Sequence, residues 1–146
     1  MDEFNKNIKW KLTRIVLPQH TDHAGVMWHG SYFNFLEEAR IDALSKVGIS
    51  YSNLSQRGYE IPLISARINY KISFLHGENF ELISQFMLLN KIRLKCKTSF
   101  MKQNGDVGAE SLIDLVVIKK QNGSIKFERD LPSEIKNALL LLQHGS

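Results

Sequence analysis

The chain has 146 residues, a formal net charge of +4, 43% hydrophobic residues and 23% charged residues. These proportions exclude a disordered chain, and the length predicts one domain over residues 1–146. The mild basic charge suits a phosphate-bearing ligand and nucleic acid equally well. The single cysteine, Cys96, excludes an internal disulfide and a cysteine-rich zinc site. No apolar leader and no membrane-length apolar run is visible, so we expect a cytoplasmic protein without a membrane partner.

The first predicted element is a strand over residues 8–17, where apolar and polar residues alternate at its start. Pro18 ends it. The next segment, residues 18–31, is rich in histidine and glycine and is too irregular for a helix or a strand.

A helix is predicted over residues 32–47, because apolar side chains recur there at helical spacing. Ser31 is the expected N-cap, and Gly48 is the expected C-terminal stop. The apolar positions predict that a sheet wraps this helix over most of its circumference.

Residues 49–59 form a connector with a short helical turn at Ser52–Gln56, and Leu131–Gln143 form a last helix opened by Pro132. Between them we predict four strands, over residues 60–74, 78–90, 92–102 and 109–120. The separators are His76-Gly77, Asn90-Lys91, Asn104-Gly105 and Asn122-Gly123. Short turns imply antiparallel neighbours, so the order of elements predicts an α+β fold with about five strands around a long central helix.

The loop before the predicted helix carries the chemistry. It places the carboxylate of Asp22 seven residues before His29, at the helix entry. A helix N-terminus has unpaired backbone N–H groups and a partial positive charge, which can stabilise the oxyanion of a thioester under attack. The carboxylate would attack the same carbonyl or activate a water molecule. Gly25 and Gly30 would permit tight turns and close approach of a ligand.

This loop resembles the active-site signature of the 4-hydroxybenzoyl-CoA thioesterase family, T-D-x-x-G-x-x-x-H-x-x-Y ahead of the long helix of the hotdog fold. The matching residues are Thr21, Asp22, Gly25, His29 and Tyr32. Glu38-Ala39-Arg40 continues the match into the helix, and weaker similarity covers nearly the whole chain. One departure is Tyr70-Lys71-Ile72-Ser73, which lacks the proline of a Tyr-x-x-Pro element common in the family, and a second is His23, where many members have a small or apolar residue.

The resemblance implies a thioesterase that cleaves an acyl-CoA without a metal or other cofactor. It implies that Asp22 is the nucleophile or general base and that the helix start at His29 polarises the carbonyl. It also implies clefts between subunits, hence a homodimer or homotetramer. The residues expected to contact the substrate from this loop are Gly25, Trp28, Gly30, Ser31 and Tyr32.

Cations form a second pattern. Four of them alternate with Ile92, Leu94, Cys96 and Thr98 on one predicted strand: Lys91, Arg93, Lys95 and Lys97. Arg67 and Lys71 form a shorter row. Such stripes are either a solubilising outer face or a contact for the phosphates of coenzyme A, and we assign Arg67, Lys71, Lys91 and Arg93 to substrate binding. The stripe lacks the interleaved aromatics that stack on RNA bases, so no nucleic-acid partner is expected.

Other readings remain open. Glu38 is either a solvated helix residue or a neighbour of the thioester. Cys96 is expected in the core. His20, His23 and His29 lack a further ligand at tight spacing, so no metal site is predicted. The substrate could be an aromatic, dihydroxynaphthoyl-type acyl-CoA or an acylated carrier protein, and the chain could instead be a non-catalytic module that binds acyl-CoA or RNA.

Overall fold

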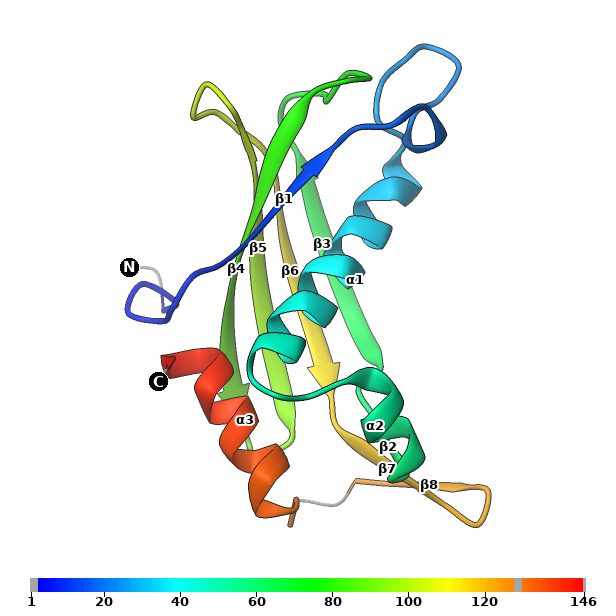
Figure 1. Ribbon diagram of the computed structural model, residues 1–146, viewed down its shortest axis with the longest axis vertical. Coiled ribbons are helices and arrows are strands. Elements are labelled where there is room, and N and C mark those ends of the chain that lie inside the picture. Colours follow the sequence, from blue (N-terminus) through cyan, green and yellow to red (C-terminus); the bar gives the residue numbers. More distant parts are fainter. Residues whose placement is uncertain (1–2, 128–129, 146) are drawn as a thin grey trace.

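The computed structural model describes residues 3–127 and 130–145. Its centre is an antiparallel sheet of five strands in the spatial order β1–β4–β5–β6–β3. The strands are β1 (Trp10–Ile15), β3 (Leu63–Tyr70), β4 (Asn79–Leu89), β5 (Arg93–Lys102) and β6 (Val107–Val116). Helix α1 (His29–Lys46) lies across one face of this sheet (Figure 1). The predicted α+β arrangement of five strands and a long helix is therefore confirmed.

Helix α1 is buried on one side only. Its sheet-facing residues are buried, among them Tyr32, Phe35, Leu36, Ala39 and Ala43. On the opposite side Phe33 is 44% exposed and Ile41 is 42% exposed. The prediction that the sheet wraps most of the helix is therefore wrong for the single chain, because five strands cover only one side of it.

The start of α1 differs from the prediction. The helix begins at His29, and its N-cap is Trp28 rather than Ser31. The Ser31 hydroxyl donates a hydrogen bond to the carbonyl of His20 at 3.0 Å, so it ties the preceding loop to the helix. At the other end Gly48 has a φ of +88°, the left-handed conformation expected of a C-terminal stop.

Two predicted strands are each divided. Residues 60–74 contain the second residue of β2 (Tyr59–Glu60) and all of β3. The two strands are separated at Pro62, which cannot donate to a strand ladder. Residues 109–120 contain most of β6 and then β7 (Ile118–Gln121). Strands β2, β7 and β8 (Ser124–Lys126) form a second, three-stranded sheet. Strand β8 was not predicted from the sequence. The turn Asn122-Gly123 joins it to β7, and both residues of this turn have positive φ.

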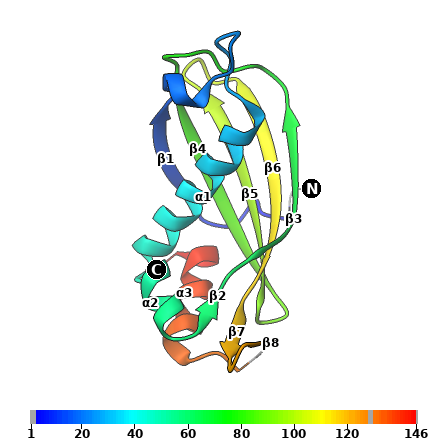
Figure 2. The ribbon, with the colours of Figure 1, turned by 90° about the vertical axis from the view of Figure 1, so that its right-hand side faces the viewer.

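The remaining α-helices gather at one end of the sheet (Figure 2), whereas a short 3-10 helix, Pro18–His20, lies in the loop at the other end. These α-helices are α2 (Tyr51–Gln56) and α3 (Ser133–His144), both predicted. Helix α3 packs against β4 and α1, and the Trp10 indole donates to its Leu142 carbonyl at 2.7 Å. We call this the turn end, because it also holds the Asn90-Lys91 turn between β4 and β5. None of the helices in the described ranges combines the length and apolarity needed to cross a membrane.

The other end of the sheet holds the loop of residues 18–28, and we call it the Asp22 end (Figure 1). Beneath it lies a cluster of touching aromatic rings, contributed by Tyr32, Phe35, Phe74, Phe80 and Phe100. The four phenylalanines are almost fully buried. This cluster gives the loop a rigid floor.

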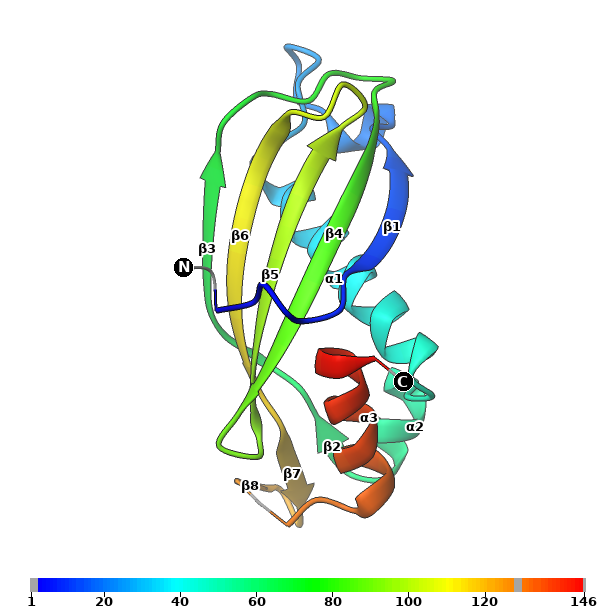
Figure 3. The same ribbon diagram turned by 90° about the vertical axis from the view of Figure 1, so that its left-hand side faces the viewer.

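The face of the sheet away from α1 carries the lysines of β5. On β5 the predicted alternation is confirmed: Leu94, Cys96 and Thr98 are buried, and the lysines between them are partly exposed. The N-terminal segment crosses this outer face (Figure 3), where the Gln85 side chain donates to the carbonyls of Phe4 and Asn7.

Candidate active site

The loop that carries Asp22 folds back on itself like a hairpin. The Asp22 amide donates to the Val26 carbonyl at 2.9 Å, and the Trp28 amide donates to the His20 carbonyl at 2.8 Å. Gly25, at the tip, has a φ of +80°, which a residue with a side chain rarely adopts. The two legs are therefore pinned together directly before α1, and Asp22 stands on the leg opposite the helix entry.

The Asp22 carboxylate is exposed and only half engaged. Its Oδ1 accepts the Ala24 amide at 2.9 Å and the Val26 amide at 3.4 Å. Within residues 3–127 and 130–145, Oδ2 has no protein partner. One oxygen therefore stabilises the loop while the other can act on a ligand.

The first turn of α1 supplies unpaired donors. In the described part of the chain, the backbone amides of His29 and Gly30 meet no acceptor, as expected for the first residues of a helix. The Trp28 indole lies against Gly30, where a Cβ atom would come within 2.1 Å of the ring. Only glycine at position 30 therefore allows the indole to pack there. The indole is 49% exposed and forms a wall beside the His29 and Gly30 amides.

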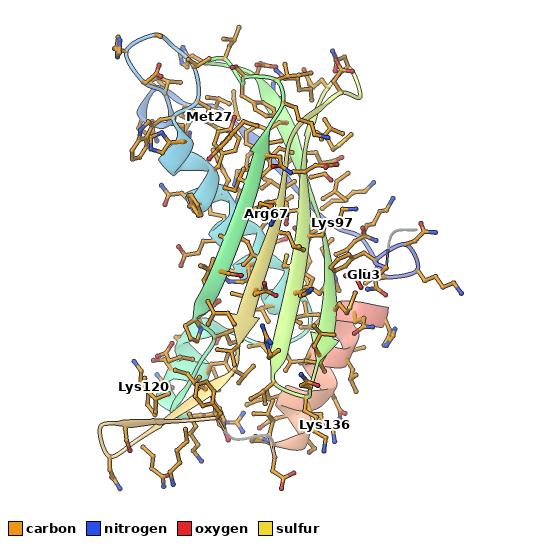
Figure 4. The ribbon with its side chains drawn as sticks, turned by 180° about the vertical axis from the view of Figure 1, so that it is seen from behind. Glu3, Met27, Arg67, Lys97, Lys120 and Lys136 are labelled. Carbon is orange, nitrogen blue, oxygen red and sulfur yellow. The ribbon has the colours of Figure 1, made fainter. Side chains whose placement is uncertain are left out.

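A second segment, Lys71–Glu78, lies beside the Asp22 loop, and we call it the support segment. The Met27 amide donates to the Phe74 carbonyl at 2.7 Å, and the His76 amide donates to the Gly25 carbonyl at 3.1 Å. Between the two segments is a hollow of about 240 Å³ at the Asp22 end, where Figure 4 labels Met27. Its lining residues are Val26, Met27, His29, Tyr32, Tyr70, Lys71, Ile72 and Ser73.

Tyr32 forms the floor of the hollow. Its ring packs edge-on against Tyr70, with centroids 4.9 Å apart, and tilted against Phe100. Burial, and then the proximity of Tyr70 and Glu78, raises the pKa of Tyr32 to about 12. The phenol therefore stays protonated and can donate a hydrogen bond at neutral pH.

An ion pair at 3.0 Å between Lys102, on β5, and Glu78 holds the end of the support segment in place. Burial alone raises the pKa of Glu78, but the Leu75 amide and the Lys102 ammonium outweigh it and hold that pKa below its usual value. Sequence reasoning missed both residues, because only the antiparallel pairing of β4 with β5 brings residues 78 and 102 together.

The predicted cations do not converge in one chain. Lys71 borders the hollow and pairs with Glu110 at 3.3 Å. Arg67 lies on the outer face of β3, near Lys97 (Figure 4). Lys91 and Arg93 lie at the turn end, at the far end of β4 and β5 from Asp22. The structure therefore brings only Lys71, of these four, to the Asp22 hollow.

The other candidate residues have structural partners. His20 accepts the Leu17 amide through Nδ1 at 3.0 Å and packs on Phe35. Glu38 pairs with Arg14 on the surface at 3.3 Å. Cys96 is 5% exposed, and burial raises the pKa of its thiol to about 11, so its predicted place in the core is confirmed. The structure brings no three histidine, cysteine or acidic side chains into a metal-binding group within the ranges it describes.

Comparison with known proteins gives the family. Residues 16–140 match the family model described as "Thioesterase-like superfamily". The chain belongs to this superfamily. A Synechocystis protein named "Putative esterase sll0410" is 31% identical over 129 residues, which are 88% of this chain and 76% of that protein. The predicted family and enzyme class, a thioester hydrolase, are thereby confirmed.

Solved structures show how this superfamily member is folded. A 1,4-dihydroxy-2-naphthoyl-CoA thioesterase from Synechocystis superposes with a TM-score of 0.81 at 20% identity, over 91% of this chain and 96% of that one. A DHNA-CoA thioesterase from Staphylococcus aureus gives 0.79 at 23% identity, over 91% and 92%. At these identities the likeness establishes the fold, and the predicted hotdog fold is confirmed.

Proposed function

We propose that this protein hydrolyses an acyl-CoA thioester at the Asp22 end, with Asp22 acting on the thioester carbonyl. The observation that carries the proposal is the pinned loop: two backbone hydrogen bonds hold an exposed carboxylate, with one oxygen unpaired in the described structure, on the loop that runs directly into the unpaired amides of His29 and Gly30. A nucleophile or base and a pair of oxyanion donors are the two components that thioester hydrolysis requires.

In the proposed reaction the carbonyl oxygen accepts hydrogen bonds from the His29 and Gly30 amides. Asp22 Oδ2 attacks the carbonyl carbon, the carbon–sulfur bond breaks, and coenzyme A leaves as a thiolate that takes a proton from water. Water then hydrolyses the acyl–aspartyl anhydride to the free acid and restores the carboxylate. An alternative route uses Asp22 as a base for a direct attack by water, and one turnover in ¹⁸O-labelled water distinguishes them: only direct attack by Asp22 can leave the label in the protein.

The acyl group would occupy the hollow. Tyr32, Tyr70, Met27 and Ile72 provide aromatic and apolar walls, and the protonated Tyr32 phenol can donate to a polar substituent. These features favour a compact acyl group, and the two dihydroxynaphthoyl-type thioesterases of the same fold add weight to an aromatic one. Lys71, on the rim, would meet a phosphate of coenzyme A. Thiol release measured with aromatic, short-chain and long-chain acyl-CoAs, and with an acylated carrier protein, identifies the preferred group and carrier.

We also propose that two copies pair through β3, which ends the main sheet. Three of its large apolar side chains are open to solvent: Leu63 is 43% exposed, Ile64 51% and Tyr70 53%. An exposed apolar strand edge invites pairing, and a two-fold axis would make the paired strands antiparallel. Light scattering on a sizing column should give a dimer or a tetramer of the 16.8 kDa chain, and Ile64→Lys should dissociate the β3 pairing. A wild-type monomer would contradict this assembly.

Asp22→Asn tests the catalytic proposal. Asparagine keeps an oxygen that can accept the Ala24 and Val26 amides, so the loop should hold its shape. Loss of the carboxylate should lower kcat by at least about 100-fold, with an unchanged unfolding temperature. Turnover near that of the wild type would remove Asp22 from the reaction. Wild-type protein that binds acyl-CoA tightly without releasing thiol would instead be a non-catalytic binding module.

A further inference from the structure

We propose that Lys102 is a positioning residue that fixes the Asp22 loop through the support segment. This inference rests on the proposed role of Asp22, but its physical part, the immobilisation of the loop, can be measured without any substrate. Lys102 touches neither the hollow nor the loop, and it acts through residues 73–78.

The ammonium of Lys102 binds the support segment at two points, Ser73 and Glu78. It donates to the Ser73 carbonyl at 2.6 Å and to the two Glu78 carboxylate oxygens at 3.0 and 3.1 Å. It also lies 4.5 Å from the centroid of the Phe74 ring. The Lys102 side chain is only 11% exposed, so these bonds are shielded from water and the residue has little freedom to move.

The support segment is also closed on itself and anchored in the core. Glu78 accepts the Leu75 amide at 2.6 Å, which completes a turn from residue 75 to residue 78. The Phe74 ring fills the space beside Gly108, where a Cβ atom would come within 2.3 Å of it. With Phe74 buried and with Ser73 and Glu78 bound by Lys102, the backbone between residues 73 and 78 is held on both sides.

Backbone hydrogen bonds carry this restraint to the catalytic loop. The Phe74 carbonyl accepts the Met27 amide, and the His76 amide donates to the Gly25 carbonyl. Val26, between them, accepts the Asp22 amide. Lys102 is thus connected to Asp22 through fixed backbone at every step, and a small error in the placement of a reacting group is costly in rate.

The sequence offers a way to test this role. Ser73 stands where the Tyr-x-x-Pro element common in the family has its proline. Proline fixes the backbone by its ring, whereas here the carbonyl of the same residue is bound by the Lys102 ammonium. We therefore expect a proline at residue 73 to replace part of the restraint that the Lys102 ammonium supplies.

The test compares Lys102→Met with Lys46→Met. Lys46 is a matched control, because it too binds one carboxylate, Asp42 at 2.9 Å, and one backbone carbonyl, that of Lys11, but it is exposed and lies at the last turn of α1. Lys102→Met should lower kcat by at least about tenfold while KM changes less than about twofold. The reason is that the variant misaligns the Asp22 loop but leaves the residues that line the hollow in place. Lys46→Met should change neither kcat nor KM.

Amide hydrogen exchange provides the readout that general destabilisation would not give. In Lys102→Met, the Met27 and His76 amides should exchange at least tenfold faster than in the wild type, while the α3 amides keep their wild-type rates. Ser73→Pro added to Lys102→Met should restore slow exchange and most of kcat, and Lys102→Arg, which keeps charge and donors, should stay near wild type. If Lys102→Met does not fold, Lys102→Gln, whose shorter, neutral side chain gives up the ion pair with Glu78, takes its place with the same expected exchange pattern.

Unchanged exchange at Met27 and His76, or acceleration spread evenly over α3 as well, would overturn the inference. This outcome is separate from a failure of the proposed function. If Asp22→Asn keeps full turnover, the catalytic proposal fails, whereas the exchange rates still decide whether Lys102 holds the loop.

Discussion

The two ends of the sheet carry similar kinds of residue and behave differently. At the Asp22 end, charged side chains lie beside two loops joined by backbone hydrogen bonds, with one carboxylate oxygen and two helix amides unpaired in the described structure. At the turn end, Lys91 and Arg93 surround a tight turn in which Asn90 and Lys91 both have positive φ. At the turn end the charged residues are part of a tight turn. At the Asp22 end the backbone hydrogen bonds hold a carboxylate in place.

The difference shows which sequence signals locate a site. The residues from 20 to 32 are close in the chain and the loop closes on itself, so closeness in sequence becomes closeness in space. Alternation along a strand, the signal that groups the cations, predicts the face of the sheet on which a residue lies but not its position along the strand. A strand of ten residues is about 33 Å long, so residues that share a face can still lie at opposite ends.

After Asp22→Asn, Gly30→Ala should have the largest effect at the Asp22 end. A methyl group there would lie 2.1 Å from a carbon of the Trp28 ring. The indole must therefore move away from the backbone amides of His29 and Gly30. We expect kcat to fall by about 100-fold, the cost of one misplaced oxyanion donor, with a small change in unfolding temperature. The change in kcat is measured by the rate of thiol release from an acyl-CoA.

The control for Gly30→Ala is the double variant with Trp28→Ala, which removes the clashing ring. If the clash is the cause, the double variant should be no slower than Trp28→Ala alone. A double variant as slow as the product of both single effects would show that Gly30 matters for another reason.

Replacing lysines at the two ends sharpens the comparison directly. Lys71→Gln should raise KM by about tenfold, since it removes a charged hydrogen bond to a phosphate worth about 1.5 kcal/mol. Lys91→Gln combined with Arg93→Gln should change KM by less than about twofold, because exposed charges remote from the ligand are screened. Steady-state kinetics at fixed ionic strength compare the KM values of the two variants with that of the wild type. A larger rise for the turn-end variant would place coenzyme A, or a partner's site, at the turn end.

The smallest expected effect is spectroscopic. The pKa of Tyr32 is raised from 10.0 to about 12, so the folded state favours the protonated phenol more than the unfolded state does. Its contribution to stability is therefore complete below pH 10 and is lost as the pH rises from 10 to 12. Rapid pH jumps followed at 295 nm should show a phenolate absorbance that appears near pH 12 and is absent in Tyr32→Phe. Its persistence in that variant would assign it to another tyrosine.

Much of the fold could be predicted from sequence because its signals are local. Alternation located the strands, apolar spacing located α1 and α3, and Asn104-Gly105 located the turn between β5 and β6. The start of α1 was placed three residues late, since Ser31 has the chemistry of an N-cap but uses its hydroxyl to hold His20. Strand β8 is too short and too exposed to show a pattern.

The candidate site could be predicted only in part, for the same physical reason. The motif from Thr21 to Tyr32 is contiguous and stands out. The Lys102–Glu78 pair depends on the register of β4 against β5, in which Phe80 faces Lys102, and no local pattern contains that register. The hollow beside Tyr32 depends likewise on the support segment reaching the loop from another part of the chain.

The most direct measurement of the central claim is a structure of Asp22→Asn with an intact acyl-CoA bound. The account predicts that the thioester oxygen lies about 2.7–3.1 Å from the Gly30 amide nitrogen, with the side chain of residue 22 facing the carbonyl carbon and the acyl group against Tyr32. A thioester bound at the turn end, or with its oxygen pointing away from the start of α1, would contradict the account.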